Sequence, residues 1–452
     1  MFKKVLVANR GEIAVRIIRA CRDLGIKTVA VYSEADRQSL HPDLADERVC
    51  LPGFKPADTY LNMEKILQAA GETGAGAVHP GYGYLAENER FAVRCGEAGL
   101  VFIGPRPENI HLAGNKLAAK EMVRAAGVPV IPGSGRGVAS LEEAQAAADE
   151  TGYPVIIKAS AGGGGRGMRI CIDQWQLKEE FSIAKAEARA SFGDDTLYIE
   201  KYLENPKHIE FQILGDASGR VVHLGERECS VQRRYQKLVE ESPSPALDDA
   251  LREKMGRAAL QLAGTINYFN AGTVEFILDK KKNFYFMEIN SRLQVEHPVT
   301  EMVTGIDIVK EQIRLSMGDT LGYNYSSVPK RGWAIECRIN AEDPENSFLP
   351  SPGEIENYRP PGGCGVRLDT HIYQGYRVPP YYDSLLAKLI AHGPDRESAA
   401  KIMLRALEEF VIEPVKTTIP LHKKILAHPL FREGDFDTGL IKLLVPDEED
   451  GD

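Results

Sequence analysis

The first 33 residues alternate between strand and helix patterns, and this alternation constrains the fold more strongly than any other feature of the chain. Residues 5–8 form a short apolar run, apolar residues recur at helical spacing from Ile13 to Leu24, and residues 28–32 form a second apolar run. A helix that joins two strands in this way makes them parallel. We therefore predict an N-terminal Rossmann-like α/β sheet. Its first turn, residues 9–12, lacks the GxGxxG spacing of dinucleotide sites.

Breaks in this pattern divide the chain into three segments. The alternation ends at Pro105-Arg106-Pro107, and residues from 113 onward follow an α+β pattern that contains a glycine-rich loop. A further set of strands begins near Trp333, and helices are expected over about 395–445. The predicted organisation is a domain at 1–112, a domain at 113–330, a mixed α/β domain at 331–446 and an acidic tail at 447–452.

Composition and charge exclude several classes of protein. With 43% hydrophobic and 27% charged residues we expect a globular chain, and its net charge of −10 gives no support for nucleic-acid binding. No apolar run approaches the ~20 residues of a membrane span, and the N-terminus resembles a strand rather than a signal peptide, so we expect a cytoplasmic protein. The seven cysteines form no CxxC pair and are expected to be reduced and mostly buried.

A glycine-rich loop at residues 160–168 is a candidate ligand site. Five of the six positions from 162 to 167 are glycine, and the loop follows a strand that ends at Lys158. Main-chain N–H groups in such a loop can approach a phosphate closely, although the lysine precedes the glycines and the P-loop order is absent. A flexible surface hairpin is the alternative, which the position of Lys158 beside an apolar strand disfavours.

Two neighbouring strand patterns, 272–278 and 283–290, are apolar apart from a single acid in each. If they pair as a hairpin, Glu275 lies beside Glu288 and Asn290, which share one face by period-2 alternation. Two carboxylates a few Å apart repel by ~4 kcal/mol at an effective dielectric of 20 unless a proton or a cation intervenes. Oxygen ligands of this kind suit Mg²⁺. A shared proton or solvent-facing acids are the alternatives.

Two further alternating strands leave the role of their polar faces open. His208, Glu210 and Gln212 share one face of the first strand, and Arg338 lies on the second. The pattern does not decide whether either face meets solvent or a ligand.

The segment after the second acidic strand places Arg292, Gln294 and Glu296 at alternate positions. An arginine fork binds a planar oxyanion with two hydrogen bonds, and a glutamate four residues on can take a proton from it. This chemistry alone is only suggestive.

Residues 286–297 resemble the signature of the biotin carboxylase family. Further motifs of this family follow in the same order along nearly the whole chain, which makes accidental similarity negligible. They are residues 8–14, residues 79–88, the glycine-rich loop, residues 232–234 and residues 338–344. The resemblance implies an ATP-grasp fold with a Rossmann-like N-terminal (pre-ATP-grasp) domain, a mobile lid at about 131–203 and a C-terminal mixed α/β domain.

The resemblance implies an activity and a nucleotide site. ATP would phosphorylate bicarbonate to carboxyphosphate, whose breakdown carboxylates N1 of biotin and leaves ADP and phosphate. The positions expected to contact ATP are Lys116, Lys158, Gly164, Gly165, Glu200, Lys201, Tyr202, Leu203, His208, Tyr235, Glu275 and Glu288. Mg²⁺ or Mn²⁺ would bind Glu275, Glu288 and Asn290. Tyr235 departs from the histidine that many members carry.

The same resemblance implies the remaining substrate contacts. Bicarbonate and biotin would be held by Lys237, Arg292, Gln294, the backbone of Val295, Arg338 and Tyr82. Glu296 would act as general base, with Arg292, Lys237 and Arg338 as the other catalytic residues. Arg338 would stabilise the enolate-like form of biotin, and Tyr82 would lie near the biotin ring.

The partners also follow from the resemblance. The chain holds no Met-Lys-Met biotin attachment motif, so we expect biotin to arrive on a separate biotin carboxyl carrier protein and to leave for a carboxyltransferase subunit. Residues around Cys364 and Arg367 resemble the family's dimer-forming region, which implies a homodimer. The favoured system is acetyl-CoA carboxylase. The alternatives are a pyruvate or propionyl-CoA carboxylase, an ATP-grasp carboxylate–amine ligase and a non-catalytic nucleotide-binding subunit.

Overall fold

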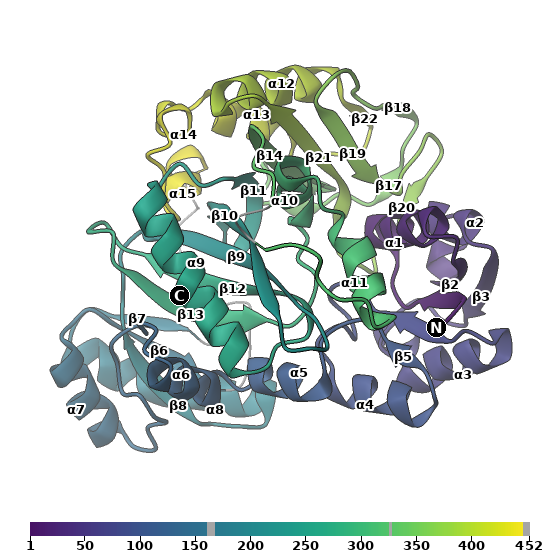
Figure 1. Cartoon of the computed structure of the whole chain (residues 1–452). Helices are drawn as coiled ribbons and strands as arrows, with labels where there is room; N and C mark the ends of the chain where they lie inside the picture. The colour runs from purple at the N-terminus through teal and green to yellow at the C-terminus, as the bar shows by residue number, and fades with distance from the viewer. Residues whose placement is uncertain (161–167, 325–327, 446–452) are drawn as a thin grey trace.

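The structure, a computed structural model, describes residues 1–160, 168–324 and 328–445, apart from the side chains of Lys116, Leu117 and Phe192. Its parts surround one large central sheet (Figure 1). The N-terminal unit lies to one side of this sheet, a small three-stranded unit with α7 and α8 lies below it, and the C-terminal helices lie above it in the view of Figure 1.

The N-terminal unit is a parallel α/β sheet, as the opening alternation predicts. The strand order is β3-β2-β1-β4-β5, and every pair is parallel. Ile13 and Ile17 on α1 are buried against it. The elements are β1 (Lys4–Val7), α1 (Gly11–Asp23), β2 (Lys27–Ser33), α2 (Leu40–Leu44), β3 (Glu47–Leu51), α3 (Met63–Thr73), β4 (Ala77–His79), α4 (Glu89–Glu97), β5 (Val101–Phe102) and α5 (Pro107–Gly114).

The small unit falls within the range expected for the lid. Its strand order is β7-β6-β8, and Ile157 pairs with Ile199 in an apolar cluster covered by α7 and α8. The sequence patterns did not predict α7. The elements from this part of the chain are α6 (Lys116–Ala125), α7 (Leu141–Thr151), β6 (Val155–Ala159), β7 (Arg169–Cys171), α8 (Gln174–Phe192) and β8 (Leu197–Lys201).

The central sheet has eight antiparallel strands and crosses the boundary expected at 330/331. Its order is β13-β12-β9-β10-β11-β14-β21-β19, and Val239 on β11 pairs with Cys337 on β14. The domain limits stay a prediction, but the two segments share one hydrogen-bonded sheet because β14 covers the edge of β11. The strands are β9 (Lys207–Gly215), β10 (Val221–Arg233), β11 (Gln236–Ser242), β12 (Asn270–Leu278), β13 (Phe284–Asn290), β14 (Trp333–Asn340), β19 (Val366–Thr370) and β21 (Leu385–Gly393).

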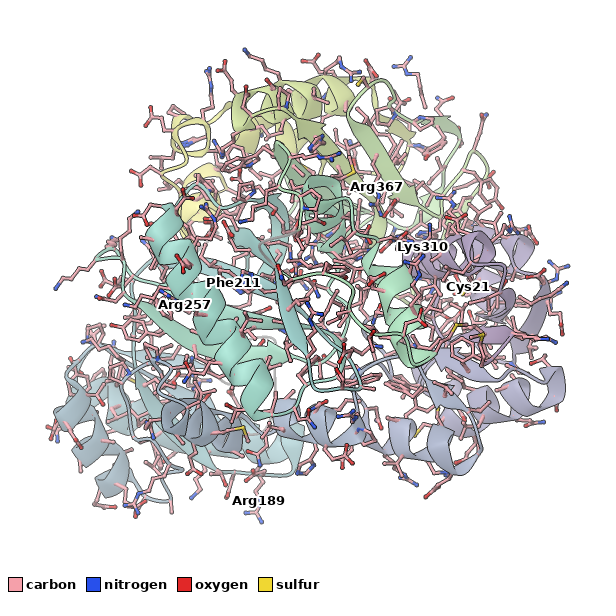
Figure 2. The ribbon with its side chains drawn as sticks, in the orientation of Figure 1. Cys21, Arg189, Phe211, Arg257, Lys310 and Arg367 are labelled. Carbon is pink, nitrogen blue, oxygen red and sulfur yellow. The ribbon has the colours of Figure 1, made fainter. Side chains whose placement is uncertain are left out.

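Helices from the segments before and after residue 330 cover this sheet. Phe211 of β9 is buried beneath α9, whereas Arg257 on the same helix is solvent-exposed (Figure 2). The C-terminal part is not purely helical after residue 395, because β22 pairs with β18 there. The helices are α9 (Asp249–Thr265), α10 (His297–Thr304), α11 (Ile308–Ser316), α12 (Arg396–Glu409), α13 (Ile419–Ala427), α14 (Pro429–Glu433) and α15 (Leu440–Leu444). The short strands are β15 (Glu342–Asp343), β16 (Leu349–Pro350), β17 (Gly353–Glu354), β18 (Asn357–Arg359), β20 (Arg377–Val378) and β22 (Val411–Glu413).

In the part of the chain that the structure describes, no helix is both long enough and apolar enough to cross a membrane. All seven cysteines are free thiols, and five of them are buried, as the sequence predicts. The exceptions are Cys50, which is half-buried, and Cys364, which is exposed.

Truncation of a core aromatic of the central sheet tests the packing beneath the acidic strand β12. Phe276 is fully buried and makes edge-on contacts with Phe211 and Phe284. Phe276→Ala should lower the free energy of unfolding by ~3–5 kcal/mol, measured by urea titration, because it leaves a cavity. Ile172→Ala, at a side chain that is 62% exposed, should change it by less than ~0.5 kcal/mol. Equal effects of the two changes would contradict this packing.

Candidate active site

A cavity of about 1430 Å³ lies where the N-terminal unit, the lid and the central sheet meet. Tyr82 and Glu87 line it from the N-terminal unit, Lys158 from the lid, and Glu275 and Arg338 from the central sheet. A site for one small ligand usually encloses ~300–1,000 Å³. The cavity therefore has room for more than one substrate.

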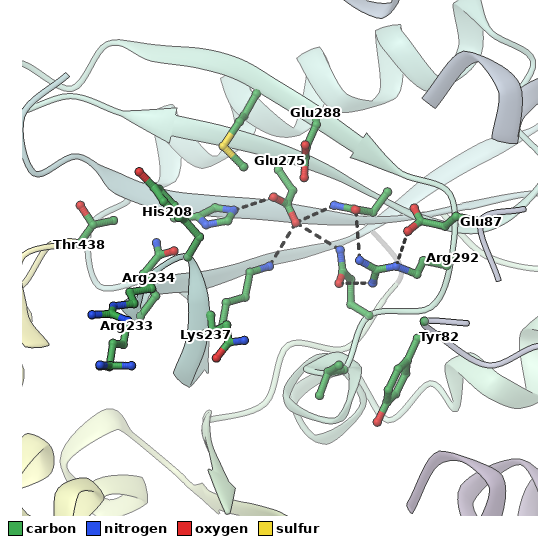
Figure 3. A pocket seen from close by; sticks show the side chains of 18 of the residues that line it. Tyr82, Glu87, His208, Arg233, Arg234, Lys237, Glu275, Glu288, Arg292 and Thr438 are labelled. Carbon is green, nitrogen blue, oxygen red and sulfur yellow. Dashed lines mark hydrogen bonds and ion pairs between the residues drawn. The ribbon is translucent and has the colours of Figure 1, made fainter. Parts of the chain in front are cut away.

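The acidic strands form the hairpin that their pattern predicts. Glu275 on β12 lies directly opposite Glu288 on β13, and Asn290 donates a hydrogen bond to Glu275 at 2.8 Å. His208 on the neighbouring β9 also bonds Glu275, at 2.9 Å (Figure 3). All four side chains line the cavity, so the hairpin carries two carboxylates and an amide to one place.

Lys237 lies at the centre of a group of buried carboxylates. Its ammonium contacts Glu210 at 2.6 Å, Glu296 at 2.6 Å and Glu275 at 3.1 Å, and Figure 3 draws the last of these contacts. Burial alone would lower the pKa of Lys237, but the carboxylates raise it well above its ordinary value. Burial likewise opposes ionisation of Glu275, yet Lys237 and His208 hold the pKa of this carboxyl below its usual range. The lysine thus relieves the repulsion among Glu210, Glu275 and Glu296.

The donor set of the hairpin fits a divalent cation. Glu275, Glu288 and Asn290 offer oxygen atoms of the kind that Mg²⁺ prefers. A second group within reach of an ion comprises His208, Glu210 and Glu275. The two groups share Glu275, and the Lys237 ammonium contacts both carboxylates of the second group.

Glu296 is held between two cations. Lys237 contacts one of its oxygens, and Arg338 contacts the other at 2.8 Å. Burial would raise the pKa of Glu296, but these cations hold it well below its ordinary value, so the side chain is a carboxylate at neutral pH. Arg338 also bonds Glu240 at 2.6 Å, where burial raises the pKa of Glu240 to about 7 despite the arginine. Among the described residues predicted for this site, Glu296 alone does not line the cavity.

Arg292 presents its guanidinium to the cavity in a fixed orientation. Its Nε donates to Glu87 at 2.8 Å, and one terminal nitrogen donates to Gln294 at 2.7 Å (Figure 3). Gln294 in turn donates to Glu275 at 3.2 Å. The alternation of residues 292, 294 and 296 therefore brings all three side chains into one bonded group with the acidic hairpin.

The lid side of the cavity holds a buried carboxylate between two lysines. Glu200 on β8 forms ion pairs with Lys158, at 2.8 Å, and with Lys120. Burial opposes its ionisation, but the two lysines outweigh burial and lower the pKa of Glu200. The ammonium of Lys201 donates to the carbonyls of Gly152 and Tyr153, at 2.9 and 2.8 Å.

Of the remaining predicted nucleotide contacts, some line the cavity and others lie outside the described residues. Tyr202 and Leu203 line the cavity, and so does Tyr235, which is 56% exposed. Gly164 and Gly165 lie outside the described residues, and so does the side chain of Lys116.

Sequence reasoning missed several residues of this site. The polar face of β9 is buried and meets cations: Glu210 bonds Arg227 at 2.5 Å as well as Lys237. The alternation of β9 had marked Glu210 without deciding what it faces. No pattern in the sequence marked a role in this site for Glu87, Glu240 or Lys120, because their partners come from distant parts of the chain.

Comparisons with known proteins agree with this geometry. Family models match in three consecutive stretches, described as the biotin carboxylase N-terminal domain (residues 1–110), the ATP-binding domain of the carbamoyl-phosphate synthase L chain (115–324) and the biotin carboxylase C-terminal domain (336–443). Biotin carboxylase 1 of Bacillus subtilis is 54% identical over 443 residues, which cover 98% of both chains. The chain belongs to the biotin carboxylase family. It is an ATP-dependent ligase with an ATP-grasp fold, so the predicted family and fold class are confirmed.

Other relatives carry the names of different carboxylases. A pyruvate carboxylase subunit of Methanothermobacter thermautotrophicus is 53% identical, over 98% of this chain and 90% of that protein. The solved biotin carboxylase domain dimer of the 2-oxoglutarate carboxylase of Hydrogenobacter thermophilus, in complex with MgADP, ADP and bicarbonate, is 54% identical with a TM-score of 0.94 over 98% of both chains. The comparisons therefore establish the family, but they do not establish which carboxylase this chain belongs to.

Removal of the central cation of the site tests its electrostatic role. In buffer with EDTA, Lys237→Met removes the ammonium that three carboxylates share. The substitution should lower the free energy of unfolding by ~3–5 kcal/mol at pH 8. In the native protein the lowered pKa values of Glu275 and Glu296 give stability that is present above the ordinary value of 4.5 and lost as the pH falls. In the variant these carboxyls regain protons more readily.

The difference in thermal unfolding midpoint between the native protein and the Lys237→Met variant should therefore be largest at pH 8 and become smaller toward pH 5. Lys27→Met, which removes a surface ammonium 3.7 Å from Asp46, should show no such trend. A difference for Lys237→Met that stays constant from pH 8 to pH 5 would contradict the electrostatic role.

Proposed function

We propose that the chain carries out the ATP- and bicarbonate-dependent carboxylation of biotin on a separate biotin carboxyl carrier protein. The observation that carries this proposal is the bonded group formed by Arg292, Gln294, Glu296 and Lys237 beside the acidic hairpin. It joins an oxyanion fork and an ionised base to a candidate cation site. The bicarbonate and MgADP bound to the Hydrogenobacter relative support the same assignment.

The nucleotide would bind between the lid and the hairpin. Its proposed contacts are Lys116, Lys158, Gly164, Gly165, Glu200, Lys201, Tyr202, Leu203, His208, Tyr235, Glu275 and Glu288. Glu275, Glu288 and Asn290 would hold Mg²⁺ or Mn²⁺, which supplies charge neutralisation for the phosphates. Lys158 is already oriented toward the cavity by Glu200. Lid closure would exclude water from the labile carboxyphosphate.

Bicarbonate would lie against Lys237, Arg292, Gln294 and the backbone of Val295. Glu296 would take its proton, and the resulting oxygen nucleophile would attack the γ-phosphorus of ATP to give carboxyphosphate and ADP. The low pKa of Glu296 keeps the side chain ionised at neutral pH, which a general base requires. These residues act by position and charge, which is where phosphoryl transfer gains most of its rate.

Biotin would enter beside Arg338 and Tyr82. Carboxyphosphate would break down to CO₂ and phosphate, the N1 proton of biotin would pass to the released phosphate, and N1 would form its bond to the CO₂. Arg338 would stabilise the enolate-like oxygen of the ring. An Arg338 side chain that turns to biotin releases one oxygen of Glu296, which opens the buried carboxylate to the cavity.

The partners and the pathway belong to the same proposal. Acetyl-CoA stays the favoured final acceptor, with a carboxyltransferase as the partner enzyme and pyruvate or propionyl-CoA as the alternatives. Relatives named for pyruvate and 2-oxoglutarate carboxylases support the first alternative and add 2-oxoglutarate. Homodimerisation is supported by the dimer of the Hydrogenobacter relative, and its location at the region of Cys364 and Arg367 stays a prediction. The cytoplasmic location stays a prediction. Capture of the biotinylated carrier and identification of its carboxyltransferase would decide the acceptor.

Steady-state ADP release by the purified chain tests the reaction itself. Release should require bicarbonate and should increase when free biotin is added. ADP release without bicarbonate, or release that biotin does not raise, would favour a carboxylate–amine ligase.

Neutralisation of the proposed base separates catalysis from binding. Glu296→Gln should lower bicarbonate-dependent ADP release by ~10²–10⁴-fold while the Kd for ATP, measured by calorimetry, stays within twofold. Glu97→Gln, at an exposed surface carboxylate, is the matched control and should retain the full rate. Unchanged turnover in Glu296→Gln would contradict its role as general base, and a native chain that shows no bicarbonate-dependent turnover would support a non-catalytic nucleotide-binding role.

Removal of one oxygen ligand tests the cation site. Glu288→Gln should raise the Mg²⁺ concentration needed for half-maximal ADP release by ~10–100-fold, because it removes a charged donor from the hairpin. The KM for bicarbonate at saturating Mg²⁺ should stay within threefold. A Mg²⁺ requirement equal to that of the native protein would exclude Glu288 as a ligand.

A further inference from the structure

Two buried side chains hold the two main-chain carbonyls that flank the amide of Val295. His297 bonds the carbonyl oxygen of Gln294 through Nδ1 at 2.8 Å, and Lys388 donates from Nζ to the carbonyl oxygen of Val295 at 2.9 Å. The next carbonyl, that of Glu296, accepts from the N–H of Val299 in the first turn of α10. The segment is therefore fixed at each successive peptide.

Lys388 reaches this segment from the opposite side of the domain boundary. It lies on β21, is fully buried, and pairs with Glu12 of α1 at 3.2 Å. Glu12 also accepts a hydrogen bond from the hydroxyl of Tyr82. A buried ammonium is costly to desolvate, so such a placement requires compensating bonds. One of these bonds goes to a peptide carbonyl of the proposed bicarbonate site.

His297 is the first residue of α10 and is also fully buried. Burial and the nearby positive charges of Lys388, Arg16 and Arg367 hold the pKa of its imidazole well below the ordinary value, so the ring is neutral. A carbonyl oxygen can only accept a hydrogen bond, and Nδ1 therefore carries the ring proton.

The planarity of the peptide group means that the bonds from His297 and Lys388 to the two carbonyls also set the directions of the neighbouring N–H groups. Each peptide unit is planar, so an anchored carbonyl also fixes the amide N–H on the other side of the same plane. The carbonyl of Gln294 shares its plane with the N–H of Val295. The carbonyl of Val295 shares its plane with the N–H and Cα of Glu296, and so sets the direction from which that side chain leaves.

We propose that His297 and Lys388 are positioning residues that together fix the two peptide planes flanking Val295. They direct the Val295 N–H and the Glu296 carboxylate to the same bound bicarbonate. The inference rests on the proposed function, because Val295 and Glu296 receive their roles there. Neither His297 nor Lys388 touches a reacting atom in this scheme. Their effect passes through the backbone that they hold.

Substitutions that remove one anchor at a time test the proposal in the full chain. Lys388→Met removes the donor to Val295 and keeps the length of the side chain. His297→Leu removes the side-chain donor to Gln294 and leaves only the longer bond from the main-chain N–H of residue 297, at 3.4 Å, whereas His297→Asn keeps a side-chain N–H donor close to the position of Nδ1. Glu12→Gln is the matched control, because it removes the ion pair of Lys388 but leaves its bond to Val295 in place.

The readout is the KM for bicarbonate and the KM for ATP in the ADP-release assay with free biotin. Lys388→Met and His297→Leu should each raise the KM for bicarbonate at least tenfold and lower kcat, with the KM for ATP within twofold of the native value. His297→Asn and Glu12→Gln should keep the KM for bicarbonate within threefold. A purely structural role would raise both KM values together.

Several results would overturn the positioning role. These are a bicarbonate KM within twofold of native in the two anchor-loss variants, a parallel rise of both KM values, or a rise in Glu12→Gln as large as that in Lys388→Met. If Lys388→Met does not fold, the comparison of His297→Leu with His297→Asn decides. If ADP release by the native chain does not require bicarbonate, the proposed function is wrong. If it does require bicarbonate but the variants show no change in the KM for bicarbonate, only the positioning role of His297 and Lys388 is wrong.

Discussion

The half-buried ammonium of Lys237 is the contact on which the rest of the site depends. It bonds three carboxylates that belong to three different parts of the fold: Glu210 on β9, Glu275 on β12 and Glu296 in front of α10. Ions taken out of water are costly unless each is closely paired. Arg227 and Arg338 complete the pairing at Glu210 and Glu296. A shift of one strand by a single residue would turn these charges to the other face and leave them unpaired.

The continuous central sheet explains how distant substrate sites stay in register. Arg338 on β14 and the acidic hairpin of β12 and β13 lie on one hydrogen-bonded sheet, although 48 positions separate Arg338 from Asn290. Groups that must meet in a reaction need placement to within a fraction of an ångström, which strands provide better than loops. The segment at residues 291–296 is the exception. It is a loop, and its rigidity comes from bonds to Glu87, His297 and Lys388.

Local patterns predicted much of the fold. The opening strand–helix–strand alternation predicted the parallel sheet, and single acids in two apolar strands predicted the hairpin that pairs Glu275 with Glu288. The boundary at 330/331 was harder to place from sequence. The change of pattern there is real, but pairing of β11 with β14 is a contact between residues about 100 positions apart, which no local period reveals. For the same reason the pattern of β9 marked Glu210 without showing that Arg227 and Lys237 face it.

The sequence by itself determined most of the strands and helices, the family and the main charged side chains that line the cavity, because periodicity and motif order are local properties. Only the tertiary structure decided how those side chains are charged and held. It buried Glu296 between Lys237 and Arg338, placed Glu240 against Arg338, and brought Lys388 to the carbonyl of Val295. Ionisation and orientation depend on burial and on partners from remote segments, and both exist only once the chain has folded.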